Sequence, residues 1–183
     1  MVDPYILTAT GWPFRFDAPG QSLSEAGRGA VLEAIAIGLS NICRFGGHTS
    51  VFYSVAQHSV LVSELLPPSL ALQGLMHDAH EAFLGEIPSP LKALLPDYQA
   101  LEQRIERAVR AWCDLPSTLH PAVKAADLVA LATERRDLMP QDAHDWPCLA
   151  GVAAHSRRIL PVRPHIAAGQ WLDRYVGLTR AAA

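Results

Sequence analysis

Apolar residues recur at helical spacing through most of this chain, and this period constrains the fold more than any other feature of the sequence. A repeat of three or four residues places apolar side chains along one face of a helix, which is buried when helices pack together. Glycine or proline follows each run, as expected near helix ends. The sequence therefore predicts an all-α fold, a helical bundle with amphipathic helices over 24–43, 50–66, 70–84, 98–112 and 121–138.

The sequence also indicates how two of these helices begin or are oriented. Thr49 or Ser50 is the expected N-cap of the helix over 50–66. In the helix over 98–112 we expect the glutamates and arginines to face solvent, so that this helix serves as scaffold. The arginines expected outside are Arg104, Arg107 and Arg110.

The two ends of the chain lack the helical period. Residues 1–23 mix aromatic residues with Gly and Pro, and they predict a short extended lead-in that could form a small hairpin. Residues 140–183 predict a C-terminal extension, irregular at first and helical around 167–178. With 183 residues, 50% of them hydrophobic, the chain has the size of a single domain (1–183) whose core spans about 24–138.

Composition excludes several classes of protein. A formal charge of -3 and a pI near 6.2 argue against a nucleic-acid binder, which usually carries a basic face. No apolar run reaches the roughly 18 residues of a membrane span, and no secretory signal is expected at the N-terminus. The three cysteines are widely spaced and form no Cys-x-x-Cys pair, so we expect reduced thiols and a cytoplasmic protein.

Charged residues interrupt the apolar faces of three predicted helices. His58, the pair His77 and Asp78, and Asp127 all fall on faces expected to be buried, and Glu81 lies one turn beyond His77. An unpaired buried charge is costly, and a divalent cation would compensate carboxylates while using imidazole lone pairs. Two ordinary explanations remain open, since an inward histidine is often a hydrogen-bonded core residue and His-Asp pairs occur by chance.

The order of these residues resembles the HD phosphohydrolase superfamily, which is named for its His-Asp pair. Three stretches carry the resemblance, which covers about residues 40–138: SVAQHS around His58, HDAHEAFLGEIPSPLK from His77, and VKAAD ending at Asp127. They look like the bacterial 5'-deoxynucleotidases and the phage deoxynucleoside triphosphate triphosphohydrolases of that superfamily.

The resemblance implies an HD-domain bundle with one catalytic divalent metal ion, of which Mn, Co, Zn, Fe and Ni all suit the ligand types. The implied ligands are His58, His77, Asp78 and Asp127. It also implies that Glu81 acts on the attacking water and that Glu86 lies beside the scissile phosphate. We expect one metal, because only His80 and His120 could supply further imidazoles, and His80 is expected near the centre or at the surface.

The resemblance further assigns contacts to substrate. Arg44 and Phe45 would hold phosphate and pack against sugar or base, and Lys92 and Lys124 would approach the phosphate chain; the alternative for the lysines is solvated surface charge. His48 either contacts substrate or caps a turn.

The function expected by resemblance is metal-dependent hydrolysis of a deoxynucleotide phosphate bond. The substrate is a monophosphate, as for a 5'-nucleotidase, or a triphosphate, and three cations favour the longer chain. A non-catalytic nucleotide sensor that keeps the metal pocket is one alternative, and a closed structural metal site is another. Relatives form dimers or rings, so a homo-oligomer is also open, although no apolar stripe could be assigned to an interface.

Overall fold

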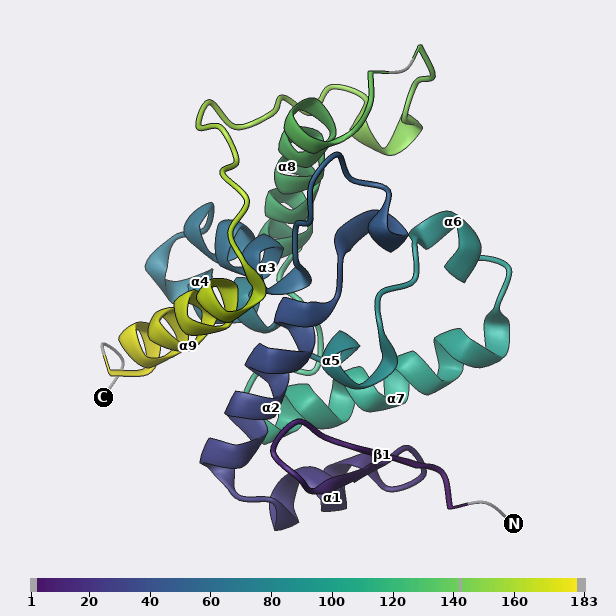
Figure 1. Cartoon of the computed structure of the whole chain (residues 1–183), viewed down its shortest axis with the longest axis vertical. Helices are drawn as coiled ribbons and strands as arrows, with labels where there is room; N and C mark the ends of the chain where they lie inside the picture. The colour runs from purple at the N-terminus through teal and green to yellow at the C-terminus, as the bar shows by residue number, and fades with distance from the viewer. Residues whose placement is uncertain (1–2, 142, 181–183) are drawn as a thin grey trace.

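The computed structural model describes residues 3–141 and 143–180, which form an all-α fold with one small hairpin (Figure 1). The strands are β1 (Tyr5–Leu7) and β2 (Pro13–Arg15), and the short 3-10 helices are η1 (Arg44–Gly47) and η2 (Pro147–Leu149). The α-helices are α1 (Pro19–Glu25), α2 (Arg28–Asn41), α3 (Val55–Glu64), α4 (Pro68–Met76), α5 (Glu81–Leu84), α6 (Ser89–Lys92), α7 (Pro96–Trp112), α8 (Pro121–Leu138) and α9 (Pro164–Arg180). No helix among these residues is both long and apolar enough to cross a membrane.

The core includes residues from Phe14 near the N-terminus to Tyr175 near the C-terminus. Helix α9 packs against α2, α3 and α4 (Figure 1). Its Trp171 is fully buried. At the other end, the expected hairpin is confirmed: β1 and β2 pair antiparallel, and Phe14 of β2 stacks on Phe83 of α5 with ring centroids 3.9 Å apart. The core is therefore wider than residues 24–138, because the helix at the end of the C-terminal extension covers apolar surface on α2 and α3.

The lead-in is not extended throughout. Residues 19–25 form α1, with Pro19 in its first turn, where proline's missing N–H costs no helical hydrogen bond. Leu23 of α1 is fully buried in the same core as Phe14. The prediction of an extended segment up to residue 23 was wrong over this helix, because seven residues are too few to display a clear helical period.

Helix α3 starts later than its N-cap prediction placed it. The cap is Ser54, whose Oγ accepts a hydrogen bond from the backbone N–H of Gln57 at 3.2 Å. The prediction of Thr49 or Ser50 was wrong because the chain before Ser54 is extended and forms a β-bridge between Cys43 and Ser54. The later start leaves His58 in the first turn of α3, fully buried.

The helix predicted over 70–84 is interrupted at residues 77–80. Helix α4 ends at Met76 and α5 begins at Glu81, and the backbone N–H of Glu81 donates to the carbonyl of Asp78 at 2.9 Å. Such a hydrogen bond to the third residue back is tighter than the spacing of an α-helix. The tightened turn keeps Asp78 and Glu81 on neighbouring parts of one surface.

Helix α5 is held close against α2. A Cβ atom added at Gly38 of α2 would lie 3.0 Å from both the Cβ and the carbonyl oxygen of Ala82. That distance is shorter than an ordinary van der Waals contact, so glycine permits the approach. The contact fixes Glu81, the neighbour of Ala82, relative to the core.

Helix α7 confirms the amphipathic helix predicted over 98–112, but two of its charged residues face inward. Glu102 is 8% exposed and Arg110 is 2% exposed. The prediction that Arg110 is solvated was wrong, because Nε and Nη2 of Arg110 both donate to the carbonyl of Pro116 as the chain leaves the helix. Glu102 is compensated by Lys92, which is described below.

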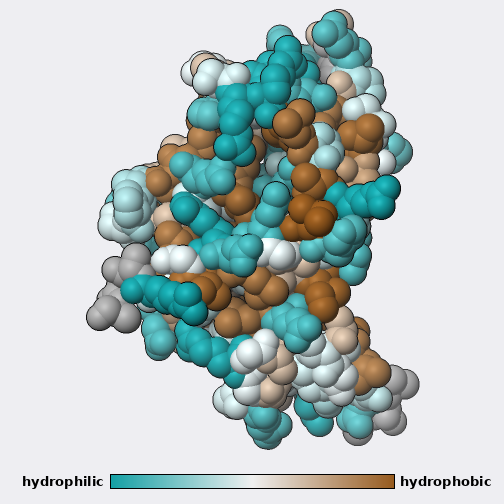
Figure 2. Space-filling view, turned by 60° about the vertical axis from the view of Figure 1, so that its left-hand side comes forward, coloured by the Kyte–Doolittle hydropathy of each residue, from teal (hydrophilic) through white to brown (hydrophobic). Residues whose placement is uncertain are grey.

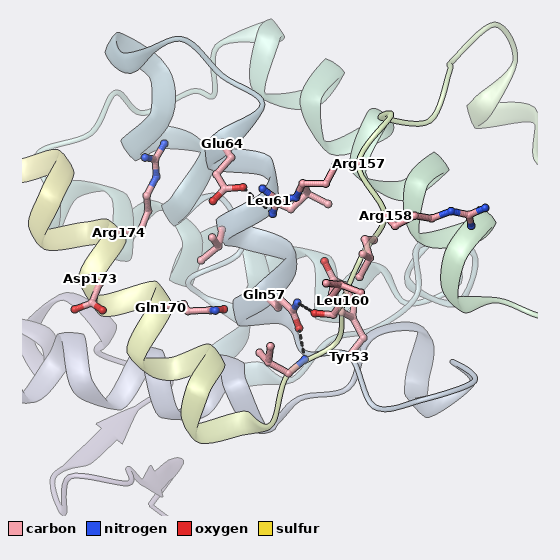
Figure 3. A pocket seen from close by; sticks show the side chains of 13 residues that line it. Tyr53, Gln57, Leu61, Glu64, Arg157, Arg158, Leu160, Gln170, Asp173 and Arg174 are labelled. Carbon is pink, nitrogen blue, oxygen red and sulfur yellow. Dashed lines mark hydrogen bonds and ion pairs between the residues drawn. The ribbon is translucent and has the colours of Figure 1, made fainter.

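Residues 153–163 form an irregular segment, the C-terminal arm, which returns the chain from α8 to α9. The side-chain amide of Gln57 on α3 forms two hydrogen bonds with this arm. Its Nε2 donates to the Leu160 carbonyl at 2.7 Å, and its Oε1 accepts from the Val162 N–H at 3.1 Å (Figure 3). The arm, α3 and α9 enclose a hollow of about 670 Å³. Several of its charged groups have partners within the protein: Arg157 forms an ion pair with Glu64 at 3.1 Å, and Arg174 Nε donates to Ser63 Oγ at 3.0 Å.

The outer surface is mixed in polarity. Figure 2 shows hydrophobic residues interspersed with hydrophilic ones across the middle of one face. Large exposed apolar residues in the C-terminal part of the chain include Leu160, Ile166 and Val176. A homo-oligomer remains a prediction.

Asp137 anchors the C-terminal arm to α8. Its side chain is 3% exposed, and it accepts hydrogen bonds from Arg158 at 2.6 Å and from the backbone N–H of Ile159 at 2.9 Å. Hydrogen bonding from Arg136, which outweighs the opposing effect of burial, lowers the pKa of Asp137 well below its ordinary value.

We expect Asp137→Asn to destabilise the protein at pH 7 by about 1–3 kcal/mol, because the charged acceptor of the partly buried Ile159 N–H is lost. A carboxyl with a lowered pKa stabilises the fold fully above its unfolded pKa of about 4 and loses this contribution as the pH falls further. Urea unfolding at pH 7 and pH 3 should therefore show a smaller difference between variant and wild type at pH 3. An equal difference at both values would contradict the assignment.

Candidate metal centre

Two helices and one turn bring the four expected metal ligands together. His58 comes from α3, His77 and Asp78 from the tightened turn, and Asp127 from α8. His58, His77 and Asp127 each offer a ligand atom within 4.8 Å of the other two. Asp78 Oδ2 lies 3.0 Å from His77 Nε2 and 3.5 Å from His58 Nε2, and Asp127 Oδ1 lies 3.4 Å from His58 Nε2.

Each imidazole is oriented by a hydrogen-bond acceptor at its Nδ1 atom. His77 Nδ1 lies 2.8 Å from the carbonyl of Gly74, and His58 Nδ1 lies 2.5 Å from Glu134 Oε1. Because a carbonyl and a carboxylate only accept hydrogen bonds, Nδ1 carries the proton in both rings of the neutral form. Both Nε2 atoms then present lone pairs to the centre, 3.3 Å apart.

This donor set fits a divalent metal ion. Two imidazole nitrogens and two carboxylates face one another, and the rings' N–H donors are used on the outer side. Metal-binding histidines are oriented in this way by a carboxylate or carbonyl on the second nitrogen. No thiolate takes part, which suits Mn, Fe, Co, Ni or Zn equally.

The electrostatics of the cluster also indicate a place for a cation. Burial and the guanidinium of Arg44 lower the pKa of His58, but the carboxylates of Glu134 and Asp127 outweigh both and raise it to about 10. Burial raises the pKa of Asp127, and bonding to His58 reverses this and lowers it well below its ordinary value. The carboxylates thus hold positive charge at the centre, as a proton or as a metal ion.

Glu81 is placed differently from the four ligands. Its residue is 5% exposed, and among the described residues Oε2 has no hydrogen-bond partner. Burial, followed by the charge of Asp78, raises the pKa of Glu81 well above its ordinary value. A buried carboxylate oxygen without a partner is rare in folded proteins and marks a group that is available to a ligand or to water.

A hollow of about 960 Å³ opens beside the centre. Charged residues line much of it: Arg44, Asp78, Glu81, Glu86, Lys92, Lys124, Asp127 and Asp145. Phe45 also lines the hollow, whereas His48 is exposed and does not, and its backbone N–H donates to the carbonyl of Phe45. Of the expected substrate contacts, all except His48 therefore share one hollow.

Arg44 is fixed between two carboxylates. It is 8% exposed, and its guanidinium lies 3.2 Å from Glu134 and 3.4 Å from Glu86. Glu86 also accepts from the backbone N–H groups of Phe45 at 3.4 Å and Gly46 at 3.3 Å. These N–H groups point to one anion because Phe45 and Gly46 both adopt left-handed backbone angles, with φ of 57° and 58°.

The two lysines differ in exposure. Lys124 is 70% exposed and donates to Asp127 Oδ2 at 2.8 Å, three residues away on α8. Lys92 is 23% exposed and donates to Glu102 Oε1 at 2.5 Å. His80, Glu81 and Glu102 form a second group with ligand atoms within 4.8 Å. Within that group the ammonium of Lys92 compensates the carboxylate of Glu102.

Sequence reasoning missed three residues of the site. Glu134 lies on the inward stripe of α8, so its position could have indicated a partner for His58. Glu102 lies between apolar positions of α7 and reads as surface charge. Trp146, with its ring centroid 6.0 Å from that of Phe45, belongs to an irregular loop where no period indicates direction.

The fold and the site define an all-helical protein with a buried histidine and carboxylate cluster that could hold a metal ion. No family model matches the chain. The uncharacterized protein YfdR of Escherichia coli (strain K12) is 44% identical over 176 residues, which cover 96% of each chain. The chain therefore belongs to the same family as YfdR. An uncharacterized protein of Rhodobacter capsulatus is 37% identical over 121 residues, which are 58% of this chain and 62% of the relative.

Proposed function

We propose that this protein is a metal-dependent phosphohydrolase of the HD type that cleaves a phosphate bond of a deoxynucleotide. The proposal is carried by the convergence of His58, His77, Asp78 and Asp127, of which the two aspartates line a hollow. Glu81, whose Oε2 has no hydrogen-bond partner among the described residues, lines the same hollow. The resemblance of the same residues to 5'-deoxynucleotidases and deoxynucleoside triphosphate triphosphohydrolases supplies the substrate class.

The protein's own groups divide the work of hydrolysis. His58, His77, Asp78 and Asp127 would hold a divalent ion, which when bound lowers the pKa of water and polarises a phosphoryl group. Glu81 would orient a water molecule through its free Oε2 and accept its proton, for which a raised pKa is suited. Glu86 would position the water or return a proton to the leaving oxygen.

The cations of the hollow support binding of a phosphate chain. Arg44 is immobilised by two carboxylates, and its planar guanidinium can donate to two phosphate oxygens at once. Lys92 and Lys124 line the same hollow and add two ammonium groups. Both a monophosphate and a triphosphate fit this description, and the number of cations favours the triphosphate.

Two aromatic rings support a ligand with a base. Phe45 and Trp146 both line the hollow, and Arg135 lies over the Trp146 ring at 4.9 Å from its centroid. Trp146→Ala is expected to raise the KM for a deoxynucleotide about tenfold with little change in kcat, because stacking on a base is worth about 1–3 kcal/mol. Steady-state kinetics measure the two constants separately, with Trp112→Phe on α7 as a variant remote from the hollow. A lower kcat with unchanged KM would contradict a stacking role.

The experiment that tests the function is direct. Purified protein is incubated with each deoxynucleoside mono- and triphosphate in Mn²⁺ or Co²⁺, and the products are separated chromatographically. Release of orthophosphate from monophosphates, or of triphosphate from triphosphates, is the expected result and decides between the two substrates. Tight binding without turnover, unchanged in Glu81→Ala, would favour the nucleotide sensor. If the protein neither binds nor hydrolyses any of these nucleotides, the proposal is overturned.

A further inference from the structure

We infer that Glu102, steadied by His80, is a positioning residue that holds the Lys92 ammonium in place beside the hollow for a substrate phosphate. The inference rests on the proposed function for the identity of the phosphate. The positioning itself is a property of the protein without substrate, so it can be measured separately.

Helix α7 holds Lys92 at two points. Glu102 Oε1 accepts a hydrogen bond from Lys92 Nζ at 2.5 Å, and Gln99 Nε2 donates to the Lys92 backbone carbonyl at 2.6 Å. Gln99 and Glu102 are three residues apart, so they project from the same side of α7. The lysine is thus fixed both at its backbone and at the end of its side chain.

Glu102 is itself held in place. It is 8% exposed, and His80 Nε2 lies 3.5 Å from the same oxygen that accepts from Lys92. His80 is 6% exposed and belongs to the turn that carries His77 and Asp78. The arrangement therefore connects α7 to the turn of the candidate metal centre.

Fixing the lysine in advance favours phosphate binding, because a free lysine side chain is flexible. A lysine side chain loses much rotational freedom when it binds a phosphate, and a lysine that is already ordered loses less. One N–H of the ammonium is used by Glu102, and two further donors remain for a ligand. A buried glutamate on the inner side of an otherwise scaffolding helix is explained by this role.

The test compares charge-removing variants that preserve shape. Glu102→Gln is expected to weaken binding of a non-hydrolysable deoxynucleotide analogue about tenfold, as measured by calorimetry with Mn²⁺ present. Lys92→Met should lower the affinity at least as much. The double variant should bind as well as Lys92→Met alone, because Glu102 acts only through Lys92. Glu106→Gln, one turn further along α7 and paired with Arg110, is the matched control and should bind as the wild type does.

A second readout does not depend on substrate. The Lys92 ammonium should give a sharp, slowly exchanging NMR signal in the wild type, assigned by its loss in Lys92→Met, and this signal should broaden in Glu102→Gln. Partial recovery of both readouts in Glu102→Asp would separate positioning from a purely structural role. If Glu102→Gln is poorly folded, Glu102→Asp provides the comparison, because it keeps the charge but withdraws the carboxylate from the Lys92 ammonium, and it should broaden the signal and weaken affinity relative to the wild type.

The possible outcomes are distinct. Inactivity and lack of nucleotide binding in the wild type would overturn the proposed function, while the ammonium signal would still test the positioning. An unchanged signal and unchanged affinity in Glu102→Gln would overturn the inference. Additive losses in the double variant would also overturn it, because they would mean that Glu102 acts independently of Lys92.

Discussion

Replacing Glu81 by Gln is expected to lower the kcat for deoxynucleotide hydrolysis by a factor of about 10²–10⁴, because the amide cannot accept a proton from water. The amide keeps the size of the side chain, so metal binding and nucleotide affinity should change little. Rates are measured with saturating substrate and Mn²⁺, alongside metal content and the Kd for a non-hydrolysable analogue. A Glu81→Gln protein with full activity would exclude Glu81 from the reaction.

The same variant should be at least as stable as the wild type. Burial and the charge of Asp78 make an ionised Glu81 unfavourable, and no described residue donates a hydrogen bond to its Oε2. A neutral amide removes part of that cost, so the Tm should be unchanged or higher. Glu33→Gln, which removes an exposed carboxylate from α2, is the control for loss of one negative charge and should leave both activity and Tm unchanged.

His77→Ala is expected to weaken binding of Mn²⁺ or Co²⁺ at least about a hundredfold and to abolish hydrolysis, because an oriented imidazole ligand is removed. The metal content of protein purified in excess metal should fall from about one ion per chain to a small fraction. Elemental analysis and calorimetric titration measure the two quantities. Chelation of the wild type with EDTA should likewise abolish activity, and added Mn²⁺ should restore it.

Two companion variants define the result. His165→Ala replaces an exposed histidine of α9 and should retain the metal. Asp127→Asn should lose affinity as His77→Ala does, although it alters helix α8 and not the turn that carries His77. Stoichiometric metal in both His77→Ala and Asp127→Asn, with circular dichroism showing folded protein, would contradict the metal centre proposed from these residues.

The helices were predictable where apolar residues repeat over several turns. Helices α7 and α8 follow from such repeats, and the small hairpin follows from its Gly and Pro residues. The start of α3 was not predictable, because Thr49, Ser50 and Ser54 are all suitable N-caps. The β-bridge between Cys43 and Ser54, which no local sequence pattern indicates, selects Ser54. The interruption at residues 77–80 was hidden for a similar reason, since its residues are compatible with a continuous helix.

The candidate site was predictable where a polar residue stands out against an apolar face. His58 and Asp127 are such residues, and the structure brings them within 3.4 Å of each other. Glu102 could not be recognised, because charged residues on an amphipathic helix usually face solvent and only the tertiary fold reveals Lys92 beside it. Trp146 was missed because its loop has no period that relates sequence position to direction.

Phe45 in η1 adopts a left-handed backbone conformation that favours glycine. A non-glycine residue with φ near 57° is about 1–2 kcal/mol less stable than glycine in the same conformation. A chain optimised only for thermal endurance would carry glycine at position 45 and would lose the ring. With phenylalanine at position 45 the protein keeps an aromatic ring at the cost of backbone strain. Phe45→Gly would relieve the strain and remove the ring.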